Sequence, residues 1–306
     1  MSADVRVHCG DALDLLRKEP DESVQCCVTS PPYYGTRDYH VEGQVGLERT
    51  PEQYVARLTE IFAEVRRVLD KRGTLWLVLG DCHNAWNGNR GTSSRYAGDR
   101  VRLQEPPFPS GYGLMAPDLK QKDLIGIPWA VAFSLRGQGW YLRSDICWAK
   151  TNPMPESVVD RPTRSHETIF LFSRSTRYYY DRAAGSEPAK SAHWPGIGPK
   201  HAAARHRNEK YIDQENHATR NLRDVWEMAS ARSHGAHVAV FPDELARRCV
   251  TIGCPPGGVV LDPFCGSGTT LAVAVASGRR AVGYDLNPDY CAMSQARVSA
   301  EGGELN

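Results

Sequence analysis

The order of strand, glycine turn, helix and acid near the carboxyl end constrains the fold of this chain more than any other feature. A predicted strand over 259–261 leads into the turn DPFCGSGTT at 262–270, and a helix is predicted from Leu271. The next predicted strand, over 281–284, ends in Asp285. In a doubly wound α/β sheet such a unit binds a nucleoside, with the acid on the ribose hydroxyls. Leu271 replaces the third glycine of the dinucleotide fingerprint, which favours a short-tailed nucleoside over a pyrophosphate; a turn that binds nothing is the alternative.

The rest of the chain alternates between strand and helix patterns. Apolar runs predict strands, and apolar residues at helical spacing predict helices, the clearest over 51–69 with Thr50 as its cap. Two strands and an aromatic run are expected to form a hairpin at the far edge of the sheet, over 141–148, 167–173 and 177–180. The alternation predicts a mostly parallel α/β sheet. The remaining predicted strands are 5–9, 24–28 and 74–79, and the remaining predicted helices are one from Ala12, 124–135 and 242–252.

A second motif, Thr29–Tyr34 (TSPPYY), follows the strand 24–28. Two prolines in succession remove two N–H donors and leave rigid carbonyl acceptors, and a tyrosine offers a flat face on which a planar base can stack. The motif therefore suits an exocyclic amine held for attack on a methyl group, although a turn punctuated by Pro-Pro is the alternative. The glycine-bearing segment 35–46 suits a loop that closes over a substrate, with Arg37 and Tyr39 as candidate phosphate contacts.

Two segments lack periodicity. Residues 82–122 are rich in Gly, Ser, Asn and Arg and are expected to form a mobile excursion. Residues 182–236 hold nine Lys and Arg against six Asp and Glu, with few apolar residues. This composition indicates an inserted module that binds a polyanion such as nucleic acid, rather than an element of the core. Its five histidines have no ligand spacing, so no metal is predicted.

Net charge and cysteine content indicate where in the cell the protein resides. The net charge is +1, so any nucleic-acid surface must be local. The start has no signal-peptide pattern, and the nine cysteines are scattered without a CxxC pair. These features predict an intracellular, cytoplasmic protein with reduced cysteines and no association with membranes.

In combination, TSPPYY, the basic segment, FPDELARR, DPFCGSGTT and GYDLNP resemble the β-class DNA amino-methyltransferases. The resemblance implies a doubly wound, mostly parallel, Rossmann-like sheet in circularly rearranged order, with the strand 5–9 beside the strand that ends in Asp285. It divides the chain into a catalytic half (1–181), a target-recognition module (182–236) and a cofactor half (237–306). The implied cofactor is S-adenosyl-L-methionine, and the implied source of the protein is bacterial, archaeal or phage-encoded. The implied partners are double-stranded DNA, a second copy of the chain and a cognate restriction nuclease.

The resemblance also implies roles for individual residues. The flipped base would be held by Ser30, Pro31, Pro32 and Tyr33. The cofactor would be bound by Asp11, Thr29, His237, Phe241, Asp262, Phe264, Gly266, Gly268, Thr269 and Asp285. DNA contacts are expected from Arg37, Arg205, Arg207, Lys210, Arg220 and Arg223.

The target base is expected to be cytosine, methylated at the exocyclic N4, because Ser30 stands where adenine-type members more often carry Asp. Methylation of adenine N6 is the alternative. A carbon-5 mechanism is disfavoured because no cysteine follows a proline in the catalytic loop. Two other classes of protein fit the sequence less well. Protein-glutamine methyltransferases carry Asn before the prolines, and a non-enzymatic nucleic-acid binder needs neither motif.

Overall fold

The computed structural model describes residues 3–84, 119–188, 219–231 and 241–305. Its strands and helices alternate along most of the chain, as predicted. The helices are α1 (Ala12–Leu16), α2 (Pro51–Val68), α3 (Ile127–Gly137), α5 (Asp243–Gly253), α6 (Thr269–Ala276) and α7 (Pro288–Ala300). The strands are β1 (Ala3–Cys9), β2 (Val24–Thr29), β3 (Leu69–Leu79), β4 (Tyr141–Lys150), β5 (His166–Ser173), β6 (Ser186–Pro188), β7 (Thr219–Asn221), β8 (Val225–Met228), β9 (Val259–Asp262), β10 (Arg280–Asp285) and β11 (Gly303–Leu305).

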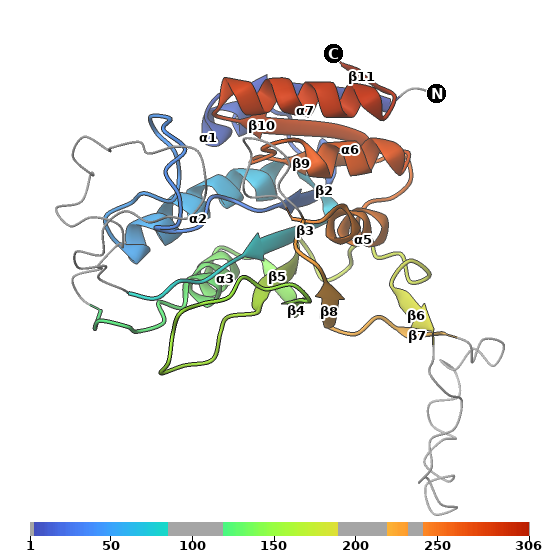
Figure 1. The fold of residues 1–306 in the computed structure, drawn as a ribbon. Coiled ribbons are helices and arrows are strands. Elements are labelled where there is room, and N and C mark those ends of the chain that lie inside the picture. Colours follow the sequence, from blue (N-terminus) through green and yellow to red (C-terminus); the bar gives the residue numbers. More distant parts are fainter. Residues whose placement is uncertain (1–2, 85–118, 189–218, 232–240, 306) are drawn as a thin grey trace, which may run out of the picture.

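A nine-stranded sheet forms the centre of the molecule, in the order β11-β1-β10-β9-β2-β3-β5-β4-β8 (Figure 1). Every neighbouring pair is parallel except the two that β5 makes with β3 and β4. The strand β1 lies beside β10 with Cys9 opposite Asp285, which confirms the predicted neighbourhood. The prediction of a doubly wound, mostly parallel sheet in circularly rearranged order is therefore confirmed.

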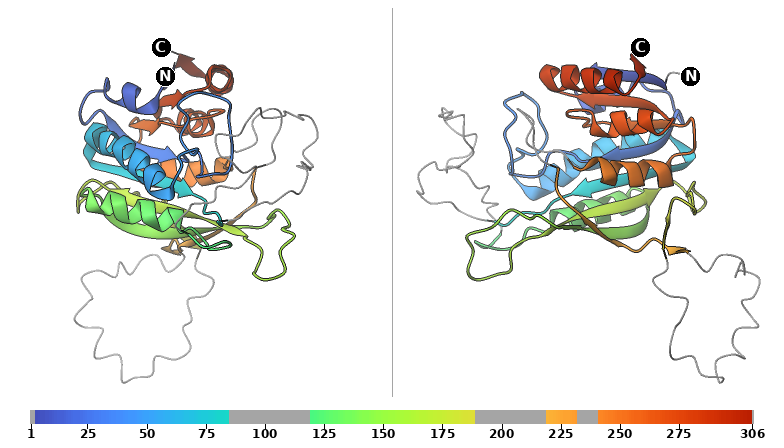
Figure 2. Two further views of the ribbon diagram at one scale, coloured as in Figure 1. Left: turned by 90° about the vertical axis from the view of Figure 1, so that its left-hand side faces the viewer. Right: turned by 45° about the vertical axis from the view of Figure 1, so that its right-hand side comes forward.

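Helices cover both faces of the sheet (Figure 2). Residues of α1, α2 and α3 pack in one apolar cluster, and residues of α5, α6 and α7 pack in a second cluster on the opposite face. The strands of the sheet contribute alternate side chains to the two clusters. In the described ranges, none of the helices combines the length and apolarity that a membrane span requires.

Local chemistry explains where several elements begin. Thr50 caps α2 by accepting a hydrogen bond from Gln53 N, and Pro51 occupies the first turn, as predicted. The predicted helix 124–135 begins later, at Ile127, because the Asp81 carboxylate accepts the free N–H groups of Gly126 and Ile127. The helix predicted over 51–69 ends at Val68, and β3 follows directly from Leu69.

Two predictions about the sheet edge are wrong. The run 177–180 forms no strand; instead Tyr179 N donates a single backbone hydrogen bond to Arg72 O of β3, at 2.9 Å. The pair β4 and β5 is antiparallel as expected but is not the edge, because β8 lies outside β4. The strand β8 comes from 182–236, so this segment does supply an element of the core.

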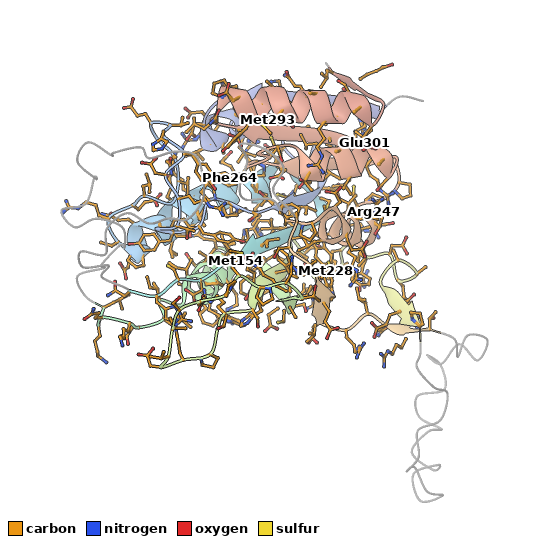
Figure 3. The ribbon with its side chains drawn as sticks, in the orientation of Figure 1. Met154, Met228, Arg247, Phe264, Met293 and Glu301 are labelled. Atoms are coloured by element: carbon orange, nitrogen blue, oxygen red, sulfur yellow. The ribbon has the colours of Figure 1, made fainter. Side chains whose placement is uncertain are left out.

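The anchor of β8 is Trp226, whose side chain is 2% exposed. Its ring stacks on Trp76 with centroids 6.2 Å apart, and its indole N–H donates to Arg223 O at 2.8 Å. Periodicity could not reveal this strand from the sequence, because β8 spans only four residues. Figure 3 labels Met228, which ends β8.

The nine cysteines are all free, and most are buried, in agreement with the prediction of reduced core residues. The predicted excursion 82–122 lies mostly outside the described residues. At its two ends, the side-chain amide of Asn84 donates to Leu119 O at 2.7 Å and to Lys120 O at 3.2 Å, which ties the ends together.

We predict that Trp226→Ala lowers the free energy of unfolding by about 3–5 kcal/mol, because it removes a large buried ring from the second cluster. Urea denaturation followed by circular dichroism measures the change. The matched control is Val225→Ala on the same strand, whose side chain is 55% exposed; its effect should stay within about 0.5 kcal/mol. Equal effects of the two variants would contradict the assignment of β8 to the core.

Candidate active site

A cavity of about 310 Å³ lies at the carboxyl ends of the parallel strands, where doubly wound sheets bind ligands. Both sequence motifs contribute to its wall, although they are more than 200 positions apart. Among the residues predicted to bind cofactor, base or DNA, those that line the cavity are Asp11, Ser30, Pro31, Pro32, Tyr33, Arg37, Phe241, Asp262, Phe264, Gly266, Thr269 and Asp285.

Asp262 joins the two motifs. Its carboxylate accepts a hydrogen bond from Thr29 Oγ1 at 2.6 Å and another from Phe264 N at 3.1 Å. Burial raises its pKa to about 6, and the hydrogen bond from Thr29 opposes that rise. Thr29 was predicted to contact the cofactor, but it does not line the cavity. It supports Asp262, which does. Figure 3 labels Phe264, in the turn that follows β9.

The glycine turn depends on two residues with positive φ. Gly266 has φ 51° and Gly268 has φ 82°, a region that other residues rarely adopt. A Cβ atom on Gly268 would lie 2.4 Å from Ser294 Oγ and 2.9 Å from Ser294 Cα, so the glycine lets α6 approach α7. Gly268 does not line the cavity, whereas Gly266 does. Of the two glycines predicted to bind the cofactor, Gly266 is therefore the one placed to contact it directly.

Asp285 occupies the tip of β10, where the sequence predicted it. Its carboxylate accepts Gly266 N at 2.9 Å and Asn287 N at 2.8 Å, and burial raises its pKa. These two bonds fix the carboxylate at the cavity wall and leave lone pairs on both oxygens for further donors such as hydroxyl groups.

Asp11 has two structural partners in addition to its place in the cavity wall. It caps α1 by accepting Leu13 N at 2.9 Å, and its second oxygen pairs with Arg57 at 2.9 Å. The cap does not conflict with the predicted contact to the cofactor, because Asp11 also lines the cavity.

The segment after β2 is held rigidly. Tyr54 Oη donates to Pro32 O at 2.9 Å, and Ser30 Oγ donates to Tyr33 Oη at 3.3 Å. Tyr33 Oη in turn donates to Glu167 Oε2 at 2.5 Å. Burial and the neighbouring Glu167 carboxylate raise the pKa of Tyr33 well above its usual value, so its phenol stays protonated.

The loop 35–46 forms one side of the cavity. Gly35 N donates to Gly46 O at 2.8 Å, and the Gln44 side chain bonds Tyr39 N and Arg37 O at 2.7 and 3.1 Å. The Tyr39 ring meets Tyr290 of α7 edge-on, with centroids 6.2 Å apart. Arg37, predicted to contact DNA, therefore lies in the wall of the cavity.

None of the other residues predicted to contact DNA is found in the described part of the cavity wall. Arg220 and Arg223 both bond one carboxylate oxygen of Glu187, at 2.7 and 2.6 Å, and neither lines the cavity. The shared bond pins β7 and the segment after it to β6. Arg205, Arg207 and Lys210 lie outside the described residues, as does His237.

Sequence reasoning missed part of the cavity wall. Trp148, Lys150 and Glu167 come from β4 and β5, and Ser230 follows β8. Lys150 Nζ is hydrogen-bonded to Glu167 Oε1 and lies 5.0 Å from the Trp148 ring centroid. Antiparallel pairing puts Trp148 opposite Glu167, which brings these side chains together. The sequence feature that could have revealed this part of the wall is the pair of opposite charges, Lys150 and Glu167, at the ends of two successive predicted strands.

Comparisons with known proteins agree with this geometry. A family model described as DNA methylase matches residues 24–296. The chain is 44% identical over 298 residues to the type II methyltransferase M.XycI of Xanthomonas campestris pv. cyanopsidis, covering 97% of this chain and 88% of that protein. It is 42% identical over 293 residues to the type II methyltransferase M.SmaI of Serratia marcescens, covering 96% and 90%.

Solved structures show the same fold. TTHA0409 of Thermus thermophilus, determined with S-adenosyl-L-methionine bound, is 25% identical with a TM-score of 0.61 and covers 98% of this chain and 97% of its own. The cytosine-N4-specific PvuII DNA methyltransferase has a TM-score of 0.64 at 18% identity, covering 100% and 96%, a likeness in fold alone.

Fold, cavity and relatives together define a DNA methyltransferase. The chain belongs to the N6/N4 DNA methylase family, and its methyl donor is S-adenosyl-L-methionine. The cavity fits this cofactor: it has a half-buried acid at the tip of β10, a glycine turn that leads into α6, and room for a nucleoside.

We predict that Asp285→Ala weakens the affinity for S-adenosyl-L-methionine at least about tenfold, because a fixed acceptor for the ribose hydroxyls is lost. Isothermal titration calorimetry measures the dissociation constant. The control is Asp289→Ala, an exposed acid in the first turn of α7 that does not line the cavity; it should bind the cofactor like the parent protein. Unchanged affinity in Asp285→Ala would contradict the role of this acid.

Proposed function

We propose that this enzyme methylates the exocyclic N4 of cytosine in double-stranded DNA, with the target base turned out of the helix into the cavity. The observation that carries the proposal is the hydroxyl of Ser30, which lines the cavity and donates its own hydrogen to Tyr33 Oη at 3.3 Å. Its lone pairs therefore face outward as an uncharged acceptor for an amine. Serine at this position is the feature by which the chain resembles cytosine-type members of the family.

Bringing the base to this wall requires its extrusion from the stack, at a cost of a few kcal/mol. The residues Ser30, Pro31, Pro32 and Tyr33 then hold it: the Ser30 hydroxyl and the Pro31 carbonyl accept the amine hydrogens, and the Tyr33 ring contacts the base. Gripping both hydrogens aims the amine lone pair toward the cofactor side. S-adenosyl-L-methionine supplies the methyl group there. Placement of the two reactants contributes most of the rate.

The cofactor side is assigned to Asp11, Phe241, Asp262, Phe264, Gly266, Thr269 and Asp285, which share one cavity. His237 is proposed to complete it. The residues 182–236 are proposed to read the target sequence, with Arg205, Arg207 and Lys210 as contacts to DNA.

Similarity to type II methyltransferases supports a role in a restriction–modification pair, in which a nuclease with the same recognition sequence cuts DNA that lacks the methyl group. A dimer of this chain remains a prediction from the family.

The target base is tested by mass spectrometry of nucleosides from DNA methylated by the purified enzyme with labelled cofactor. We expect N4-methylcytosine as the labelled product. Labelled N6-methyladenine would overturn the assignment to cytosine and leave the class of enzyme intact. Sequencing the modified DNA gives the recognition site in the same experiment.

We predict that Tyr33→Ala abolishes methylation, with a loss of about 100-fold or more, while the affinity for the cofactor stays unchanged, because the base loses its stacking partner. Single-turnover kinetics and calorimetry measure the two quantities. The control is Tyr34→Phe, which removes a buried hydroxyl without a hydrogen-bond partner among the described residues; it should retain activity within about threefold. Full activity in Tyr33→Ala would eliminate the stacking role.

A further inference from the structure

A chain of hydrogen bonds leads along the cavity wall from Ser30 to Glu167. Ser30 Oγ donates to Tyr33 Oη at 3.3 Å, and Tyr33 Oη donates to Glu167 Oε2 at 2.5 Å. The second carboxylate oxygen, Oε1, accepts from Lys150 Nζ. All four side chains line the cavity. The two hydroxyls thus donate in one direction, toward the carboxylate.

This direction gives the chain a chemical property. A hydroxyl that donates to one partner presents only lone pairs to the next, so Ser30 Oγ meets an incoming amine as an acceptor. The carboxylate at the far end orients both hydroxyls, and hydrogen bonds in such a chain polarise one another. The Glu167 side chain is 14% exposed and the Lys150 side chain 23%, so their ion pair is largely shielded from water yet retains a path to it.

The backbone holds Tyr33 in the position that these hydrogen bonds require. A Cβ atom on Gly80, at the end of β3, would lie 2.5 Å from Tyr33 Cε2 and 2.7 Å from Cδ2. Only glycine leaves the phenol this close to the sheet. The bond from Tyr54 Oη to Pro32 O fixes the preceding turn. The Ser30–Tyr33–Glu167 chain is therefore built into the fold.

We propose that Glu167 is a positioning residue of the methyl transfer: through Tyr33 it sets Ser30 as an acceptor and finally takes the proton that the amine loses. The proposal rests on the transfer to an exocyclic amine in "Proposed function" but is independent of which base carries that amine. Lys150 orients the carboxylate and keeps its charge throughout.

The step balances in atoms and charge. A bond forms between the amine nitrogen and the methyl carbon while the bond between sulfur and that carbon breaks, its electron pair remaining on sulfur. The positive charge thereby moves from sulfur to the amine nitrogen. The nitrogen then gives one proton to Ser30 Oγ, Ser30 passes its own to Tyr33 Oη, and Tyr33 passes its own to Glu167 Oε2. Glu167 becomes a neutral carboxylic acid and later releases the proton to water.

The test uses Glu167→Gln, which keeps the shape and an acceptor for Tyr33 but lacks the negative charge and the capacity to take the proton. With cofactor and DNA saturating, we expect the single-turnover rate to fall by about 100-fold. The dissociation constants for both ligands should stay within about twofold. Tyr33→Phe interrupts the chain while retaining the ring, so it should show the same pattern, with Tyr34→Phe as its matched control.

The double variant Tyr33→Phe/Glu167→Gln distinguishes a chain from two separate contributions. Residues that act as one unit lose little more together than singly, so the double variant should be within about threefold of the slower single variant. The proposal is overturned if Glu167→Gln keeps a third or more of the parent rate, if the two losses multiply, or if the loss appears in the affinity for DNA or cofactor.

Two further readouts keep the test interpretable. Thermal unfolding shows whether Glu167→Gln is folded; if it is not, Tyr33→Phe alone decides, and a rate near that of the parent overturns the proposal. The product made by the parent enzyme tests the proposed function separately from the role of Glu167. If the parent protein methylates no exocyclic amine, the proposed function has failed, whereas a normal product in the parent with no loss in either variant rejects only the role of Glu167.

Discussion

The hydrogen bond from Thr29 Oγ1 to Asp262 at 2.6 Å is the contact on which the site depends. It joins the end of β2 to the end of β9, which are neighbours in the sheet through Cys26–Val260 and Cys27–Leu261. On one side of it lies the segment proposed to hold the base, and on the other the turn proposed to hold the cofactor. Both partners are buried, so the bond is strong in its surroundings, and its loss would leave the buried carboxylate with fewer hydrogen-bond donors.

Much of this arrangement could be predicted because it is local or periodic. The strands β1, β2, β9 and β10 carry apolar runs that end in polar or glycine residues, and parallel strands bring those ends to one edge. Asp285 and Ser30 were placed in this way. The neighbourhood of β1 and β10 was implied by the family resemblance, and the structure adds the register, with Cys9 opposite Asp285.

Other parts of the site depend on register, which the sequence does not display. Glu167 meets Tyr33 across 134 positions, and Lys150 meets Glu167 only because β4 and β5 run antiparallel with Trp148 opposite Glu167. A shift of one residue would turn these side chains to the other face of the sheet. The same limit applies to β8, whose four residues are too few to reveal a period, and to Arg37, whose backbone is held in the loop by a bond from the Gln44 side chain.

The position of β8 connects the base side of the cavity to the segment proposed to read DNA. Thr151 N donates to Met228 O at 3.2 Å, and the Asn152 side chain bonds Ser230 N at 2.6 Å, so the wall that carries Lys150 is tied to the residues that follow β8. Ser230 itself lines the cavity. Because the hydrogen bonds among Ser30, Tyr33 and Glu167 are built into the fold, this connection fixes where Lys150 and Glu167 lie relative to the segment proposed to read DNA.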